Sequence, residues 1–404
     1  MIFLDAAATT PVRREVIEAM FPYLTNQFGN PSSHHELGQL AATALAAARE
    51  QCAAVLGCHA EELIFTSGGT EADNLALKGI ALARRAANPA RNRVVISAIE
   101  HPAIADSADY LSRVHGFVVE LVPVGPDGVV DPAVFAAVLG GARAGSAGAG
   151  RDDGGTQVPG ADVAIASVMY ANNEVGTIQD IPVLARIARS HGVPFHSDAV
   201  QAAGWLDLDV NRLGVDALSI SGHKLGAPKG VGLLYVKGSV PLEPLIHGGG
   251  QEGGIRSGTE NVAFAVALAT ALGLSETGRA ESAVRVAALR DGFIDSVLEQ
   301  IPAASLTGHR SSRLPGVASF CFPGTSGESL LLELERQSIM CSSGSACAAG
   351  SDEPSAVLSA MAVERAVAQT ALRFSLGADV AENDLVLAVR ELVAAVATVG
   401  KLGR

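Results

Sequence analysis

Strand-like and helix-like segments alternate along most of this chain, and that alternation limits its fold more than any other feature. Apolar runs typical of strands lie at 63–66, 94–97, 118–122 and 161–169, and stretches typical of helices lie at 70–87, 104–115 and 181–191. Further strand-like runs follow near Phe195, Leu218 and Leu233. Strands joined by helices form mainly parallel sheets with helices on both faces. The sequence therefore predicts an α/β domain.

The pattern changes after Asn261, where long helical stretches alternate with only two strands. Helices are expected at 262–274, 281–300, 328–337 and 382–399, and strands at 317–320 and 372–375. This order is typical of a smaller α+β domain, and 404 residues suit two packed domains. We expect residues 12–260 to form the large domain, and residues 1–11 with 261–404 to form the small one.

One segment, residues 140–160, is rich in Gly and Ala and has no periodicity. It is predicted to be a flexible surface insertion rather than a linker between domains, because strand-like sequence of the same sheet continues after it. No function is assigned to it.

Charge and cysteine content argue against several classes of function. The formal net charge of −13 disfavours a nucleic-acid groove or an anionic membrane surface as a partner. The start of the chain shows no secretion signal, and the longest apolar helical stretch, 262–274, is too short to span a bilayer. The five cysteines have no zinc-site spacing, so we expect reduced thiols, no resident metal and a cytoplasmic protein.

Polar side chains gather just past the ends of the predicted strands. They are Ser97, Asn172, Asn173, Asp198 and the run Ser221–Lys224. Ligands of parallel sheets bind at the carboxyl ends of the strands, so these groups together indicate one site.

Lys224 is the most informative of these groups, because it follows an apolar run, 215–220, that is typical of a buried strand. Burying an unpaired ammonium is costly, and an imine to pyridoxal phosphate removes that cost. Asp198 ends a second strand and could pair with the pyridine nitrogen of such a cofactor. For an isolated Gly-His-Lys motif, a surface lysine after a strand is the alternative.

Residues 66–72, Thr-Ser-Gly-Gly-Thr-Glu-Ala, join a strand to a helix and could hold the cofactor phosphate. Glycines admit an anion to the backbone, and the helix start supplies N–H groups, with Thr70 as a hydroxyl donor. An ordinary helix cap is the alternative. The spacing is not that of a P-loop, so nucleotide binding is disfavoured.

Four further residues could contact this cofactor. Gln201 could bond the phenolic oxygen of the ring, and Ser221 and His223 could donate to the phosphate. His101 follows a strand and could lie flat on the ring and move protons. A structural histidine is the alternative for His101.

Arg373 lies in a strand-like run, and its planar fork suits the carboxylate of an amino-acid substrate. A structural salt bridge is the alternative. Asn173 and Asn30 are plausible amide partners for the same carboxylate.

Cys347 lies in a run of small residues, 341–351, which cannot anchor itself in a core and is expected to be a mobile loop. An exposed cysteine there could act as a thiolate nucleophile, whereas most cysteines are inert. Cys341 follows an apolar pair and is expected to be a packed strand residue, and Cys321 to be in the core.

The motifs of this chain form an ordered set, which includes Asn30-Pro31-Ser32-Ser33-His34, Thr66–Glu71, Glu100-His101, Asn172–Gly176, His196–Gln201, Ser221–Lys224, Arg256–Thr259 and Ser343–Cys347. This set resembles the NifS/IscS-type cysteine desulfurases. These belong to the class V aminotransferases, which are fold-type I pyridoxal-phosphate enzymes. The resemblance covers nearly the whole chain and implies a seven-stranded sheet in the large domain.

The resemblance also implies a role for each matching residue. Lys224 would bind the cofactor as an imine, while the other cofactor contacts would come from Gly69, Thr70, His101, Asn173, Asp198, Gln201, Ser221 and His223. Thr259 would reach the phosphate of a partner subunit, which implies a homodimer. Arg373, Asn173 and Asn30 would hold the substrate carboxylate. Cys347 would take the sulfur, and a transient iron–sulfur cluster at Cys347 stays open.

The implied reaction removes sulfur from L-cysteine, giving L-alanine and a persulfide on Cys347. The sulfur acceptor is left open between an iron–sulfur scaffold protein, a tRNA-thiolation enzyme and another thiolation pathway. Two alternatives are a selenocysteine lyase or other β-eliminating enzyme, and a non-catalytic scaffold in iron–sulfur assembly. Ala348 follows Cys347 where the family often has threonine.

Overall fold

A seven-stranded sheet forms the centre of the computed structural model, which describes residues 1–141, 160–343 and 354–402. Its strands lie in the order β2 (Leu63–Thr66), β8 (Gly232–Val236), β7 (Ala217–Ser221), β6 (Phe195–Asp198), β5 (Val163–Ser167), β3 (Arg93–Ser97) and β4 (Val118–Val122). Strand β8 runs antiparallel to both neighbours, and the other pairs are parallel. The expected mainly parallel sheet is confirmed.

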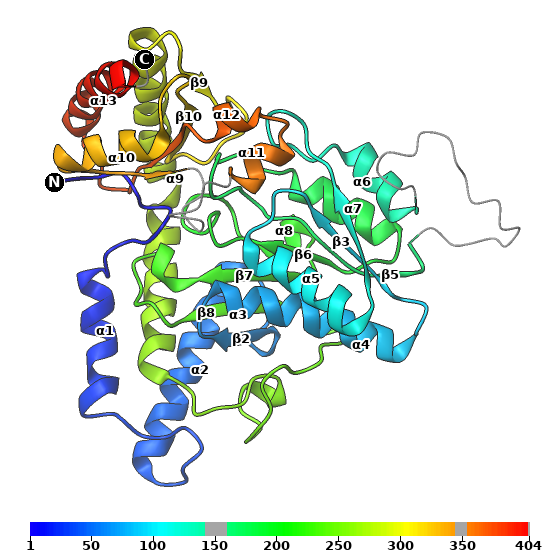
Figure 1. Cartoon of the computed structure of the whole chain (residues 1–404). Coiled ribbons are helices and arrows are strands. Elements are labelled where there is room, and N and C mark those ends of the chain that lie inside the picture. The colour runs from blue at the N-terminus through cyan, green and yellow to red at the C-terminus, as the bar shows by residue number, and fades with distance from the viewer. Residues whose placement is uncertain (142–159, 344–353, 403–404) are drawn as a thin grey trace, which may run out of the picture.

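Helices cover both faces of this sheet (Figure 1). Six of the seven strands are buried along their whole length, as expected for apolar strands covered on both sides. The helices of this part are α1 (Arg14–Thr25), α2 (Glu36–Leu56), α3 (Gly69–Asn74), α4 (Ile80–Ala87), α5 (Pro102–His115), α6 (Pro132–Leu139), α7 (Ile181–Ser190) and α8 (Val210–Leu213). Short helical turns lie at η1 (Ala60–Glu62), η3 (Gly222–Lys224) and η4 (Glu252–Gly254), and a π-helical turn, η2 (Leu75–Gly79), joins α3 to α4.

Helix α9 (Val262–Gln300) is one continuous helix of 39 residues, so the expectation of two separate helices at 262–274 and 281–300 is wrong. The intervening residues contain no proline, and the single Gly278 costs only about 1 kcal/mol in a helix. An ion pair between Arg279 and Glu276, 2.8 Å long, bridges adjacent turns there. The helix packs on α1 and α2 at one end and reaches the small-domain elements at the other (Figure 1).

A four-stranded sheet forms the smaller part of the molecule, in the order β12 (Ser342–Ser343), β13 (Ala371–Ser375), β10 (Val317–Cys321) and β9 (Ser305–Leu306). The N-terminal β1 (Ile2–Phe3) pairs in parallel with β11 (Ile339–Met340). Helices α10 (Gly327–Arg336), α11 (Ala356–Ala360), α12 (Arg365–Ala368) and α13 (Glu382–Leu402) complete it. Because α9 contributes to the cores of both parts, the domain boundary at residue 260 stays a prediction.

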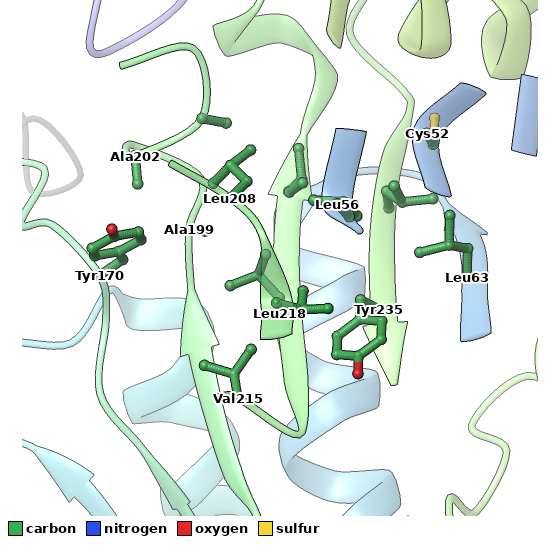
Figure 2. Close-up of a cluster of buried hydrophobic side chains, with 14 of the residues drawn as sticks. Cys52, Leu56, Leu63, Tyr170, Ala199, Ala202, Leu208, Val215, Leu218 and Tyr235 are labelled. Atoms are coloured by element: carbon green, nitrogen blue, oxygen red, sulfur yellow. The ribbon is translucent and has the colours of Figure 1, made fainter. Parts of the chain in front are cut away.

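The largest hydrophobic cluster lies between the central sheet and the helices on one of its faces. Figure 2 shows part of it, where Cys52 and Leu56 of α2 lie near Leu63 and Tyr235 of the sheet. Burial raises the pKa of the Cys52 thiol to about 12, and this cysteine packs as a small apolar residue. Within the described part of the chain, no helix is long and apolar enough to cross a membrane. Residues 142–159 of the predicted insertion lie outside the described residues.

Candidate active site

Lys224 ends the short η3 turn that directly follows β7, at the carboxyl edge of the sheet. Its half-buried amine donates hydrogen bonds to two backbone carbonyls of the N-terminal segment, those of Ala7 and, at 2.8 Å, of Ala8. Gln201 Nε2 donates to the same Ala7 carbonyl at 3.0 Å. The first residues of the chain therefore lie across the site, and the Ala7 carbonyl is a shared acceptor that positions both Lys224 and Gln201.

Asp198 is the last residue of β6 and is 5% exposed. Its Oδ1 accepts a hydrogen bond from the Val200 N–H at 2.8 Å, which orients the carboxyl group. Burial raises the pKa of Asp198, while the nearby His101 and Lys224 act in the opposite direction. A buried carboxyl of this kind gains stability as an anion when a cation is brought against it, and the protonated pyridine of pyridoxal phosphate is such a cation. The donor set thus fits this cofactor.

His101 caps the N-terminus of α5, where its Nδ1 accepts from the Ala103 N–H at 3.1 Å. With Nδ1 as an acceptor, the neutral ring carries its proton on Nε2. Burial is the main cause that lowers the pKa of His101; Lys224 lowers it as well, and Asp198 opposes them. His101 is therefore an uncharged ring, which suits contact with the face of a cofactor.

The proposed phosphate-binding residues lie where α3 begins next to the end of β7. A Cβ added at Gly69 would lie 3.3 Å from the Cβ of the buried Ser221, so the two backbones approach closely. Thr70 is exposed beside them. His223 Nδ1 is 3.1 Å from Thr9 Oγ1, and burial with nearby Lys224 and Lys229 lowers the pKa of His223 to about 4. An uncharged imidazole, a hydroxyl and helix-start N–H groups form a donor set suited to phosphate.

Arg373 lies in the middle of β13 and is 2% exposed. Its Nη2 pairs with Asp5 Oδ1 at 2.8 Å, and its Nη1 donates to the Asn173 carbonyl at 2.8 Å. The structural salt bridge that was the alternative for Arg373 is therefore formed, with Asp5 as its partner. Among the described residues, however, the buried Nε has no hydrogen-bond partner, so one donor of the fork is left for an acceptor such as a substrate carboxylate.

The remaining predicted site residues in the described part of the chain, Asn30 and Thr259, have no hydrogen bond to Lys224, Asp198 or Arg373. Asn30 is exposed, and its side chain accepts from the Ser32 N–H at 2.9 Å, while the Thr259 side chain is exposed. The roles of both stay predictions. Cys347 lies outside the described residues, so its place in the site also stays a prediction. Cys341 is half-buried between β11 and β12, and burial raises the pKa of its thiol to about 12, as expected for an unreactive packed residue. Cys321 is fully buried in β10, as expected.

Sequence reasoning missed three acids near the site, Asp5, Asp73 and Glu174. Glu174 accepts a hydrogen bond from the Ser355 hydroxyl, which caps α11, and burial raises the pKa of Glu174 to about 7. Asp73 is buried on α3, four residues after Gly69. That spacing places both on one face of a helix and is the signal that could have found Asp73.

Comparison with known proteins assigns the chain to a family. The family model described as "Aminotransferase class-V" matches residues 2–143 and 156–387. The gap in this match, residues 144–155, lies inside the segment predicted as an insertion.

Curated relatives carry the name cysteine desulfurase. The chain is 44% identical over 398 residues to the "IscS-like cysteine desulfurase" of Mycobacterium tuberculosis, covering 98% of this chain and 96% of the relative. It is 40% identical over 392 residues to the "Cysteine desulfurase NifS" of Azotobacter vinelandii, covering 97% and 91%. A solved "NIFS-LIKE PROTEIN" is 32% identical with a TM-score of 0.86, over 98% of this chain and 99% of that one. Another, "SspA in complex with cysteine", is 31% identical with a TM-score of 0.76, over 93% and 99%.

Proposed function

The chain belongs to the aminotransferase class-V family and is a pyridoxal-phosphate-dependent cysteine desulfurase, and from this premise we propose which of its residues carry the reaction. The overall reaction converts L-cysteine to L-alanine and passes the sulfur to a protein thiol. A selenocysteine lyase and a non-catalytic scaffold are not favoured, because the curated relatives at about 40% identity carry the name cysteine desulfurase. The observation that carries the residue assignment is that Lys224 and Gln201 both donate to the Ala7 carbonyl, while the buried Asp198, oriented by the Val200 N–H, lies near Lys224 and His101.

The cofactor residues take the roles that their positions support. Lys224 would bind the cofactor through its amine, Asp198 would pair with the pyridine nitrogen, His101 would contact the ring and Gln201 would contact the phenolic oxygen. Gly69, Thr70, Ser221 and His223 would hold the phosphate, and Asn173 would be a further cofactor contact. When bound, pyridoxal phosphate withdraws electrons from the α-carbon of the amino acid and so weakens its C–H bond.

The substrate carboxylate binds at Arg373, with Asn173 and Asn30 beside it. The unpartnered Nε of Arg373 supplies one donor, and the carboxylate shares Nη2 with Asp5. A solved relative that is bound to cysteine supports an amino-acid site of this kind.

Proton transfer falls to Lys224 rather than His101. In the neutral His101 ring, Nδ1 already accepts the Ala103 N–H, so the proton on Nε2 makes this ring a donor towards the site. The Lys224 amine removes the α-proton, and the carbonyls of Ala7 and Ala8 hold the resulting ammonium.

Sulfur transfer falls to Cys347. Its thiolate attacks the substrate sulfur, forming an S–S bond while the C–S bond breaks and its electron pair stays on the β-carbon. Two protons then complete the methyl group and the α-carbon of L-alanine, so the persulfide forms without an external oxidant or reductant.

The enzyme acts as a homodimer and hands its sulfur to a protein acceptor, such as an iron–sulfur scaffold or a tRNA-thiolation enzyme. Exposed apolar side chains on α1, namely Ile17, Phe21 and Leu24, with Phe28 after it, support an interface between two copies. Free thiols at Cys52, Cys58, Cys321 and Cys341 support a cytoplasmic location. Nucleic acid and membrane are not partners in this proposal.

The experiment compares Cys347→Ser with Cys341→Ser. The Cys347→Ser enzyme should keep the visible absorption of bound cofactor yet lose at least about a hundredfold in alanine formation from cysteine. Cys341→Ser, at a packed thiol, should retain alanine formation. Turnover retained by Cys347→Ser, or lost equally in both variants, would contradict the assignment of Cys347.

A further inference from the structure

A chain of buried polar side chains lies on one face of the central sheet, next to Asp198. Residues two apart on a strand share a face, so His196 and Asp198 of β6 point to the same side. Ser167 of β5 is aligned with His196, and Ser219 of β7 is aligned with Asp198. All four are buried, and α3, which carries the buried Asp73, packs on β7.

These side chains are joined by short contacts. Ser167 Oγ lies 2.9 Å from His196 Nδ1, and His196 Nε2 lies 2.9 Å from Ser219 Oγ. Asp73 Oδ1 lies 3.8 Å from His196 Nε2, and Ser219 is close enough to hydrogen-bond the Asp73 side chain, which by itself would lower the pKa of this carboxyl. The contacts form one row from β5 to α3. Each hydroxyl can donate to either neighbour, and the neutral imidazole donates from one ring nitrogen and accepts at the other, so the hydrogen bonds of the row can point towards β5 or towards α3.

Asp73 has few groups that would stabilise a negative charge. It is 1% exposed, and its Oδ1 has no hydrogen-bond partner among the described residues. The nearest imidazole nitrogen, His196 Nε2, is 3.8 Å away, and burial lowers the pKa of His196 to about 3, so that ring is uncharged. Asp198 differs, because it has the Val200 N–H, His101 and Lys224 close by.

Other carboxyl groups face Asp73 as well. Asp198 on β6 and Glu100, just after β3, both lie close enough to raise its pKa, which burial already places well above the usual range. Burial raises the pKa of Glu100 itself to about 8. Like charges in a buried cluster disfavour each other, so the negative charge settles on the member with the most donors and cations.

We propose that Asp73 stays an uncharged carboxylic acid that donates its proton to Ser219 and, through His196, sets the direction of the whole hydrogen-bond row. Ser219 then donates to His196 Nε2, and His196 Nδ1–H donates to Ser167. Asp73 is thus a positioning residue. Its effect on the cofactor rests on the proposed pairing of Asp198 with the pyridine nitrogen, because an uncharged Asp73 leaves the negative charge on Asp198.

The protonation state is tested directly by infrared difference spectroscopy on the cofactor-loaded full-length chain at neutral pH. Wild type minus Asp73→Asn should show one carboxylic-acid C=O band that is absent from the variant. Glu100→Gln should remove a separate band, and Asp109→Asn, at an exposed ion pair, should remove none. A carboxylate band lost in Asp73→Asn instead would overturn the proposal. This readout is independent of turnover, so its failure is distinguishable from failure of the catalytic assignment.

The positioning role is tested by cofactor retention. Asp73→Val keeps the approximate shape but has no donor, and it should release pyridoxal phosphate during dialysis about tenfold faster than wild type. Asp73→Asn can donate an N–H to Ser219 and should rescue retention. Should Asp73→Val not fold, Ser219→Ala, which cuts the same row, takes its place with the same expected loss. Retention equal to wild type in the donor-free variant, or no rescue by asparagine, would overturn the role.

Discussion

Arg373 Nη2 and Asp5 Oδ1 lie 2.8 Å apart, although the two residues are separated by nearly the whole chain. Ser375, on the same strand as Arg373, accepts the Ala7 N–H through its hydroxyl at 2.9 Å. The N-terminal segment therefore pairs with Arg373 through Asp5 and, two and three residues later, accepts hydrogen bonds from Lys224 through the carbonyls of Ala7 and Ala8. The proposed substrate-binding arginine and the proposed cofactor lysine are positioned by the same short stretch of backbone.

Replacing Arg373 with lysine should raise the KM for cysteine about tenfold to a hundredfold, with a smaller effect on kcat. Lysine keeps the charge but cannot present the planar fork to a carboxylate and to Asp5 at once. Steady-state kinetics of alanine formation measures this, with exposed Arg336→Lys as the matched control. An unchanged KM would rule out Arg373 as the carboxylate site.

Asp198→Asn should lower kcat about a thousandfold and alter the visible absorption of the cofactor. The amide cannot hold the pyridine nitrogen in its protonated form, so electron withdrawal from the substrate weakens. The same substitution at Asp216, which accepts the Phe195 N–H at the opposite end of β6, should leave turnover within a small factor of wild type. Equal losses in both variants would indicate a structural defect instead.

Because of the titration of Glu174, the free energy of unfolding should fall as the pH rises from about 4.5 to about 7. Burial raises its folded pKa from 4.5 to about 7, so in this window the folded chain binds more protons than the unfolded chain, and raising the pH favours unfolding. At about 1.4 kcal/mol per unit, the effect on the free energy of unfolding is at most about 3 to 4 kcal/mol.

Glu174→Gln removes this titration. Its melting temperature relative to wild type should therefore be higher at pH about 8 than at pH about 5. Ser355→Ala, which removes the hydroxyl that lowers the pKa of Glu174, should extend the wild-type slope to higher pH. A constant difference between Glu174→Gln and wild type across this range would contradict the prediction.

Arg313→Met should destabilise the fold by about 3 kcal/mol. Arg313 is buried and donates to the carbonyls of Val175, Thr307 and His309, and each would lose a donor in the variant. The Val175 carbonyl belongs to the loop that carries Asn173, so the KM for cysteine should rise too. Arg310→Met, at an exposed pair with Asp295, should cost less than about 1 kcal/mol in urea unfolding.

Much of the site could be predicted because it follows from local order. His101 and Lys224 follow strands of one mainly parallel sheet and Asp198 ends another, and the carboxyl ends of such strands meet at one edge. The continuity of α9 could not be predicted, because a short polar stretch with one glycine looks like a helix boundary until contacts with both cores stabilise it. The unpartnered Nε of Arg373 could not be predicted either, since it depends on which groups fold around it.

The sequence by itself determined the α/β class, the family and the residue types that its cofactor chemistry needs, because periodicity and ordered motifs are properties of the chain alone. Only the tertiary structure decided how charge is shared among them. Asp73, Glu100 and Asp198 are equivalent carboxylic acids in sequence, yet burial and the donors around each one differ. Protonation of a buried group depends on neighbours brought from distant segments, so it is established only when the chain has folded.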